Sequence, residues 1–282
     1  MMSGTIAALA VLATALSPVS ELVPSGVGLS YQRPLGQVAE YRLLLEVRGE
    51  QISLGERRPV RVSAELAFTE EVVAQERDGV MWLRVGARPV EARDASGTFA
   101  ARGREHWPHV QVRMTPRGEV LDVSLATGEH WAGVAERSFV SLMAQPAPVV
   151  LRPGRTAVGD EWEWESAGAS QRSRLVEVRG EGAGQVARIV SESRAPLELT
   201  EGSEALGLAT RVSGDVAQQS EVDLLVARGL VARHKGEMEV HTKSEVTLAL
   251  PEGPRVFDMR SDLQIEFDLK LVRVDGEAVN LR

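Results

Sequence analysis

Residues 257–271 read FDMRSDLQIEFDLKL, and charged or amide side chains occupy every second position of this stretch. Phe257, Met259 and Leu263 belong to one set, whereas Asp258 and Arg260 belong to the other. An alternation with a period of two places one face of a β-strand on a core and the other face in water. The stretch therefore predicts a long strand that is buried on one side.

Two runs that precede this stretch, at 208–226 and 233–250, alternate in the same way and predict two more strands. Each has about 20 residues, whereas strands usually have about 5 or 6. Straight strands of that length would extend about 60 Å, and a compact domain of this size is only about 45 Å across. We therefore predict that the sheet coils strongly, kinks at β-bulges, for which Gly214 and Gly236 are the candidates, or forms an elongated body.

The N-terminal half shows the same period in shorter runs, at 41–48 and 61–68. Turn signals separate the runs, and one of them is TPRGEVLDVS at 115–124. Proline presets φ at the first turn position, and glycine accepts the positive φ of tight turns. We interpret 115–124 as a hairpin turn and not as a catalytic loop, because carboxylates beside hairpin turns, such as Glu119 and Asp122, usually face solvent.

One segment departs from this period. Residues 129–145, EHWAGVAERSFVSLMAQ, place Trp131, Val134 and Phe139 at helical spacing, and Pro146 ends the pattern. The predicted fold is therefore mainly β, with long coiled antiparallel sheet of about 11 strands in a half-barrel or sandwich-like arrangement and one helix near residues 129–144.

A proline-rich connector at 146–158 separates two meanders. We predict an N-terminal β meander plus helix at 36–145 and a C-terminal meander of long strands at 159–275. The alternative is that the two meanders form one continuous domain.

Composition restricts the function classes. The chain has 282 residues, of which 43% are hydrophobic, and a formal net charge of −8. Nucleic-acid partners require clustered positive charge, so we expect no nucleic-acid partner. The chain has no cysteine, which excludes disulfides, thiolate metal sites and a cysteine nucleophile.

The run TIAALAVLATAL at 5–16 is uncharged and apolar, and Ser17 and Pro18 follow it. A helix needs about 20 apolar residues to span a bilayer, so this run suits the core of a signal peptide. We predict a signal peptide at 1–20 and a secreted or periplasmic, cell-envelope location; a buried N-terminal helix is the alternative. We expect no transmembrane span, because no later segment is apolar enough to cross a membrane as a helix.

Three patterns resemble chemical motifs and have simpler interpretations. Trp162 and Trp164 alternate with Glu161, Glu163 and Glu165, which fits an edge strand with two core anchors better than a sugar site. His106, His109 and His130 lack the convergent spacing of a metal site, and the GEGAG stretch at 180–184 precedes no predicted helix that would bind phosphate. We therefore predict no cofactor, no metal and no enzymatic activity.

The stretch VQVRMTPRGEVLDVS at 110–124, the proline-rich link and VGDEWEWES at 158–166 resemble a pattern of an uncharacterised domain-of-unknown-function family of secreted bacterial β-rich proteins, over about residues 36–275. The resemblance implies an exported β-rich protein and no active residue. A looser similarity is to the periplasmic lipoprotein-carrier fold, a curled antiparallel sheet that shelters acyl chains. The chain departs from that fold because it lacks an early amphipathic helix.

Two functions fit these patterns best, and a third, an exported hydrolase that uses the carboxylates near Trp162 and Trp164, is the least favoured. The first is a non-enzymatic cell-envelope protein that binds or carries a lipid or another apolar ligand on the inner face of its long strands. The alternative is a structural or interaction module that contacts an envelope protein partner and has no small ligand. Many inward positions are small or weakly polar, which indicates a partly wet groove. The predicted ligand-binding residues are Gln218, Ser220, Val222, Val240, Thr242, Ser244, Ser261 and Leu263.

Overall fold

The structure is a computed structural model, and it describes residues 26–94, 97–99, 109–126, 146–203, 208–250 and 253–279. The predicted signal peptide at 1–20, the predicted helix near residues 129–144, and His106 and His130 lie outside the described residues.

The described chain consists almost entirely of strands. The N-terminal half contains β1 (Val27–Gly28), β2 (Val38–Ser53), β3 (Glu56–Gln75), β4 (Met81–Asp94), β5 (Gly97–Phe99), β6 (Val110–Met114) and β7 (Val120–Leu125). The C-terminal half contains β8 (Arg155–Thr156), β9 (Glu161–Ser166), β10 (Ala169–Arg179), the short 3₁₀ turn η1 (Gly182–Gly184), β11 (Val186–Ser203), β12 (Leu208–Leu225), β13 (Leu230–Leu250), β14 (Gly253–Val274) and β15 (Glu277–Ala278). The prediction of a mainly β protein with very long C-terminal strands is confirmed.

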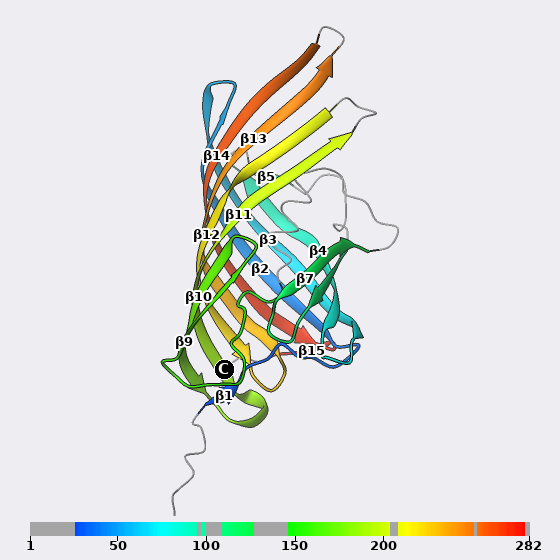
Figure 1. The fold of residues 1–282 in the computed structure, drawn as a ribbon, viewed down its shortest axis with the longest axis vertical. Coiled ribbons are helices and arrows are strands. Elements are labelled where there is room, and N and C mark those ends of the chain that lie inside the picture. The colour runs from blue at the N-terminus through cyan, green and yellow to red at the C-terminus, as the bar shows by residue number, and fades with distance from the viewer. Residues whose placement is uncertain are drawn as a thin grey trace, which may run out of the picture.

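The strands form one large antiparallel sheet in the order β7-β6-β4-β3-β2-β14-β13-β12-β11-β10-β9. β5 adds to β4 and β15 adds to β14, while β1 and β8 make a separate two-stranded sheet. β2 pairs with β14 along most of its length, so strands from the two predicted meanders share the same sheet. The order begins at β7 and ends at β9, and these edges do not pair, so the sheet is curled but open (Figure 1).

The predicted bulges at Gly214 and Gly236 are wrong, because β12 and β13 stay in register through both glycines. A Cβ atom at Gly214 would lie 1.9 Å from the carbonyl oxygen of His241, and one at Gly236 would lie 2.2 Å from that of Gln219. The missing side chains therefore allow adjacent backbones to approach and the sheet to coil without an extra residue. The register shift between β12 and β13 occurs instead at Asp223/Leu224.

The hydrophobic core fills one end of the curled sheet, which we call the base. Residues 26–37 and 146–160 lie across this end. Tyr31 and Leu151 are buried there, and their backbone N–H groups donate to the carbonyl oxygens of Pro116 and Arg117, both at 2.8 Å. The Tyr31 hydroxyl donates to the carbonyl oxygen of Val149 at 3.0 Å. The connector predicted from its prolines is thus part of the core.

A buried ion pair fastens the N-terminal segment to the base. Arg33 Nη1 lies 2.6 Å from Glu70 Oε2, and both side chains are almost fully buried. Arg33 also donates to the amide oxygen of Gln37 and to the backbone carbonyl of Glu70. Burial raises the pKa of the Glu70 carboxyl, and the neighbouring guanidinium opposes that rise. The pKa of Tyr41 rises for the same reason.

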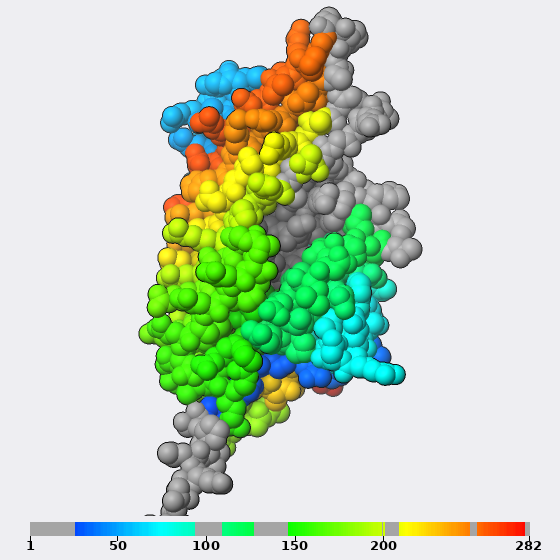
Figure 2. Space-filling model, viewed as in Figure 1, coloured from blue at the N-terminus to red at the C-terminus, as the bar shows by residue number. Residues whose placement is uncertain are grey.

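The opposite end of the sheet, which we call the flared end, consists of the tips of the long strands. It contains the Leu54–Gly55 turn between β2 and β3 and the adjoining ends of β13 and β14 at Leu250 and Gly253. These tips stand apart from one another at the top of the molecule (Figure 1), and they project well beyond β9, β10 and the base in the space-filling view (Figure 2).

Candidate ligand-binding face

The face of the sheet that turns toward the core, called here the inner face, carries every residue of the predicted site. Strand alternation accounts for this placement, since these residues share parity with buried neighbours such as Leu224, Met238 and Phe267. The predicted residues are Gln218, Ser220 and Val222 on β12, Val240, Thr242 and Ser244 on β13, and Ser261 and Leu263 on β14. Whether they bind a ligand stays a prediction.

Strand register brings the five predicted residues of β13 and β14 into one patch. Val240 lies opposite Leu263, and Thr242 lies opposite Ser261. Ser244 follows on the next row. The patch alternates between apolar rows and rows of small hydroxyl side chains, and Val240, Ser244 and Ser261 within it are buried.

The three predicted residues of β12 lie nearer the base. Val222 is fully buried there. Gln218 Nε2 lies 3.2 Å from Nε2 of His234, so the amide donates to the imidazole. The Ser220 hydroxyl oxygen is buried and has no hydrogen-bond partner among the described residues. This part of the inner face is a small polar cluster set into the core.

His234 belongs to this cluster and was not predicted as a site residue. Burial lowers the pKa of its imidazole to about 3, so the ring is neutral at physiological pH. It packs edge-on against Phe267, with ring centroids 4.7 Å apart. Its parity with Met238 and Val240 is the sequence signal that places it inward.

Apolar side chains continue on the inner face beyond the core, between rows of small polar side chains. The buried core reaches Val240, against which Val216 and Leu263 pack. Further toward the flared end, the inner face continues with further apolar side chains, all of them half-buried: Leu197, Val212, Val246, Leu248, Phe257 and Met259. None of these side chains belongs to the core cluster or packs against it within the described ranges.

The alternating tryptophans of β9 point inward and the glutamates outward, as predicted. Trp162 and Trp164 are half-buried, whereas Glu161, Glu163 and Glu165 are exposed. The Trp162 indole N–H donates to the carbonyl oxygen of Val150 at 2.8 Å, and that of Trp164 donates to a carboxylate oxygen of Glu119 at 3.3 Å. The tryptophans thus fix the β9 edge to the connector and to the turn before β7.

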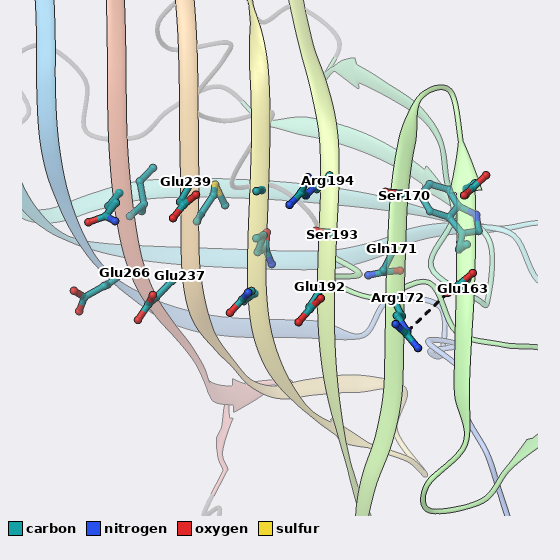
Figure 3. Close-up of a pocket in the computed structure, with 18 residues that line it drawn as sticks. Glu163, Ser170, Gln171, Arg172, Glu192, Ser193, Arg194, Glu237, Glu239 and Glu266 are labelled. Atoms are coloured by element: carbon teal, nitrogen blue, oxygen red, sulfur yellow. Dashed lines mark ion pairs between the residues drawn. The ribbon is translucent and has the colours of Figure 1, made fainter.

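A groove of about 670 Å³ crosses β9 to β14 and has a different character. Exposed charged side chains from successive strands line much of it: Glu163, Arg172, Glu192, Arg194, Glu237, Glu239 and Glu266. Figure 3 shows them side by side across the strands, with the Arg172–Glu163 ion pair marked. Such a lining does not suit an apolar ligand.

Within the described ranges, no three His, Cys, Asp or Glu side chains are placed to hold a metal ion. In the same residues, no helix has the length and apolarity needed to cross a membrane.

Comparisons with known proteins do not assign the chain to a family. No family model matches the chain, and no curated protein matches it, so the resemblance to a secreted bacterial family stays a prediction.

Among solved structures, the chain is similar to lipovitellin, from a study of lipid–protein interactions, with a TM-score of 0.44 and 9% identity over 88% of this chain and 26% of that one. The chain thus spans about a quarter of the lipovitellin chain. It is also similar to an outer membrane channel from Pseudomonas putida F1, with a TM-score of 0.23 and 9% identity over 83% of this chain and 96% of that one. For OccK2 (OpdF) from Pseudomonas aeruginosa the TM-score is 0.21 and the identity 8%, over 84% of this chain and all of that one. Likenesses at these TM-scores do not establish a common function.

Proposed function

We propose that the protein is a non-enzymatic, exported β protein of the cell envelope that holds a lipid or another apolar ligand against its inner face. The ligand would occupy the rows between Val240 and the flared end. The proposal is supported chiefly by one observation: apolar inner-face side chains such as Val246 and Phe257 continue beyond the core, without core neighbours in the described part of the chain.

The dimensions of this strip favour a chain-like ligand. From Val240 to Leu248 the strip runs about 26 Å along β13, which is longer than one leaflet, since the hydrocarbon core of two leaflets is roughly 30 Å thick. The strip is a few strands wide, because β12, β13 and β14 contribute to the same rows. Burying an apolar chain along it would remove apolar surface from water at about 25 cal/mol per Å².

The hydroxyl side chains on the strip would set the orientation of the ligand. Thr242 and Ser261 face each other across the strands, one row above Val240. Ligand sites are typically apolar with a few placed polar groups that give specificity. A polar group of the ligand would therefore lie beside Thr242 and Ser261, with its apolar part toward the flared end.

The absence of enzymatic activity is part of the proposal. The only buried hydroxyl on the inner face that lacks a partner, among the described residues, is that of Ser220, and no base contacts it. His234 is neutral and hydrogen-bonds to Gln218. Nucleophilic catalysis requires a nucleophile within hydrogen-bond reach of its base, and Ser220 and His234 are not hydrogen-bonded to each other.

Export to the cell envelope is supported by the apolar run at 5–16, which has the length of a signal-peptide core. Reading the N-terminus of the protein isolated from its native host tests this part of the proposal. A mature protein that begins near residue 20 is expected, and an intact Met1 would refute export.

A structural or interaction module is the second candidate, and the edge strand β7 favours it. Val120, Leu121 and Val123 on this strand are 44%, 48% and 46% exposed. An apolar edge strand offers unpaired backbone groups to an extended segment of a partner. The β9 edge, in contrast, carries three exposed glutamates that discourage such pairing.

The two candidates are distinguished by uptake of a fluorescent fatty acyl probe. Ser244→Trp places an indole on the inner face between Val212 and Met259, where it would fill the proposed strip. Thr247→Trp, on the outer face of the same strand, is the matched control. We expect uptake by the parent and by Thr247→Trp and at least tenfold weaker uptake by Ser244→Trp.

No uptake by the parent, or equal uptake by a folded Ser244→Trp variant, would leave the interaction module as the better proposal. Native mass spectrometry of the purified protein is the independent readout. A co-purifying lipid that is absent from Ser244→Trp would support the proposed function directly.

A further inference from the structure

The turn at the tip of the β2–β3 hairpin is both strained and exposed. Leu54 and Gly55 form a two-residue turn in which both φ angles are positive, at 53° and 80°. Positive φ at both positions defines the type I′ hairpin turn, which strongly favours Asn-Gly or Asp-Gly. A branched, bulky residue at positive φ is a conformational outlier. The fold alone therefore gives no reason for leucine at this position.

Two other hairpins in the chain show what the turn requires. Asp275–Gly276 and Ala167–Gly168 are also two-residue turns with positive φ at both positions. They use a residue that tolerates this conformation or a small one. Leu54 is the largest side chain at positive φ in the described chain, and it is 75% exposed. Packing against the protein therefore does not compensate for its strain.

Arginines and glutamates lie beside this exposed leucine. Arg57 and Arg58 follow the turn, with side chains 73% and 72% exposed, and they pair with Glu50 at 3.5 Å and with Glu56 at 2.8 Å. Arg61 lies further along the same strand. Residues 50–61 contain these three arginines and two glutamates, Glu50 and Glu56, a net charge of +1. The whole chain carries −8. Exposed apolar side chains and nearby arginines each favour contact with the interface of an anionic bilayer.

A second strand tip at the same end also presents an apolar residue. Val256, close to the β13–β14 turn, is 60% exposed and follows Arg255. In Figure 1 the β2–β3 and β13–β14 hairpins both point away from the base. A bilayer that contacts these tips would face the end of the inner face at which the apolar strip ends.

We propose that the flared end docks on an anionic membrane surface, with Leu54 inserted at the headgroup level and Arg57 and Arg58 in contact with lipid phosphates. The base presents exposed apolar turn residues as well, Leu35 and Val158, but neither has a positive φ. The neighbouring carboxylates of Asp160 and Glu161 pair with Arg152 and Arg172. Docking is a property separate from ligand binding, and either can fail without the other.

Binding to vesicles of equal parts phosphatidylglycerol and phosphatidylcholine, measured by co-sedimentation of the full chain, tests the proposal. Leu54→Asn removes the apolar tip and relieves the strained φ, so the variant is expected to fold. Because one inserted leucine favours binding about tenfold, we expect at least that loss of vesicle binding. Ala167→Asn makes the same change in a matched turn away from the flared end and should bind like the parent.

Two further variants distinguish the contribution of the arginines to vesicle binding from that of the inserted leucine, and docking by the flared end from docking by the base. Arg57→Gln with Arg58→Gln should weaken binding to the anionic vesicles by about fivefold per arginine and leave binding to pure phosphatidylcholine unchanged. Leu35→Asn at the base should have no effect. Ser244→Trp, which blocks the proposed ligand strip, should still bind vesicles, so that failure of docking and failure of the proposed function are distinguishable.

The proposal is overturned if the parent does not bind either vesicle, or if Leu54→Asn binds as the parent does. A loss of binding in Leu35→Asn without one in Leu54→Asn would show that the base docks instead, and it would overturn the proposal equally.

Discussion

The base and the flared end are built from the same strands and the same alternation, yet their inner faces differ in burial. On β2, Tyr41, Leu43 and Leu45 are 4%, 2% and 3% exposed near the base. Toward the flared end, Val47 and Gln51 occupy the same face of the same strand and are only half-buried. The difference lies in what faces them. At the base, the opposite strands and residues 26–37 and 146–160 cover the sheet. Alternation therefore determines which way a side chain points, and the covering segments determine how deeply that side chain is buried.

The largest expected effect concerns the ion pair that fastens residues 26–37 to the base. Arg33→Met removes the cationic partner of the buried Glu70 carboxylate and leaves Tyr41 as its side-chain hydrogen-bond partner, which should reduce the free energy of unfolding by about 3–5 kcal/mol. The pKa of Glu70 is already raised and should rise further. A raised folded-state pKa adds stability below the ordinary carboxyl pKa and loses it as the pH rises through the raised value. Urea melts at several pH values should therefore show the smallest loss in acid, below about pH 4.

The double variant Arg33→Met with Glu70→Leu is the control for this prediction. Replacing both members of a buried pair with apolar residues is often neutral, so most of the stability should return. A double variant as unstable as the single one would mean that the pair itself, and not the orphaned charge, holds the base together.

The same truncation at the two ends tests the comparison most directly. Leu224→Ala, in the fully buried base, should cost about 2–5 kcal/mol of unfolding free energy. Leu248→Ala, on the half-buried inner face near the flared end, should cost about 1 kcal/mol or less, because it leaves no enclosed cavity. Equal losses in denaturant melts would show that the flared end is packed as tightly as the base.

A smaller effect, of opposite sign, is expected at the tip. Leu54→Asn should raise the free energy of unfolding by about 1 kcal/mol, because asparagine tolerates positive φ and leucine does not. Thermal melts of this variant beside Ala167→Asn would show whether the leucine carries the greater strain. A destabilised Leu54→Asn would indicate that the leucine has a packing partner in the folded chain.

The smallest expected effect concerns two histidines of β13 whose pKa values are shifted in opposite directions. His234, on the inner face near the base, has its pKa lowered to about 3 by burial, and should stay neutral above about pH 4. His241, on the outer face toward the flared end, has a raised pKa because Asp262 accepts a hydrogen bond from it at 2.8 Å. Its contribution to stability is present below the ordinary pKa and is lost as the pH rises through the raised value. Asp262→Asn should lower the pKa of His241 and leave the pKa of His234 unchanged, as measured by NMR titration of both imidazoles.

Much of the fold follows from alternation alone, because an alternating strand reveals which of its faces is buried without knowledge of its neighbours. Thr242 and Ser261 were placed inward on this basis, and the structure has them opposite each other. Pairing partners were not predictable, since alternation on β2 does not reveal that β14 lies beside it. The same reasoning explains the wrong bulges at Gly214 and Gly236, because the cause of close strand approach is the neighbouring backbone.

The parts of the candidate site that sequence reasoning missed depend on contacts between distant residues. Nothing local marks Arg33 as buried, and its burial becomes clear only when Glu70 is placed beside it. His234 had a usable signal in its parity, but its neutral state depends on burial by Phe267 and its surroundings. Leu54 carries no local signal, because the length of the hairpin loop, and hence the positive φ, follows from the strand register.

The pairing of β2 with β14 has a consequence for how the chain acquires its structure. Tyr41 lies opposite Leu271, and 230 positions separate them along the chain (271 − 41). Contacts of such high sequence separation form slowly, because the entropy cost of closing a long loop comes before the favourable free energy of strand pairing. During synthesis, β2 therefore waits with an open edge until almost the whole chain has emerged. The pairing of β2 with β14 at the centre of the sheet is thus the last to form. Until then, the long strands on either side of it need protection from self-association.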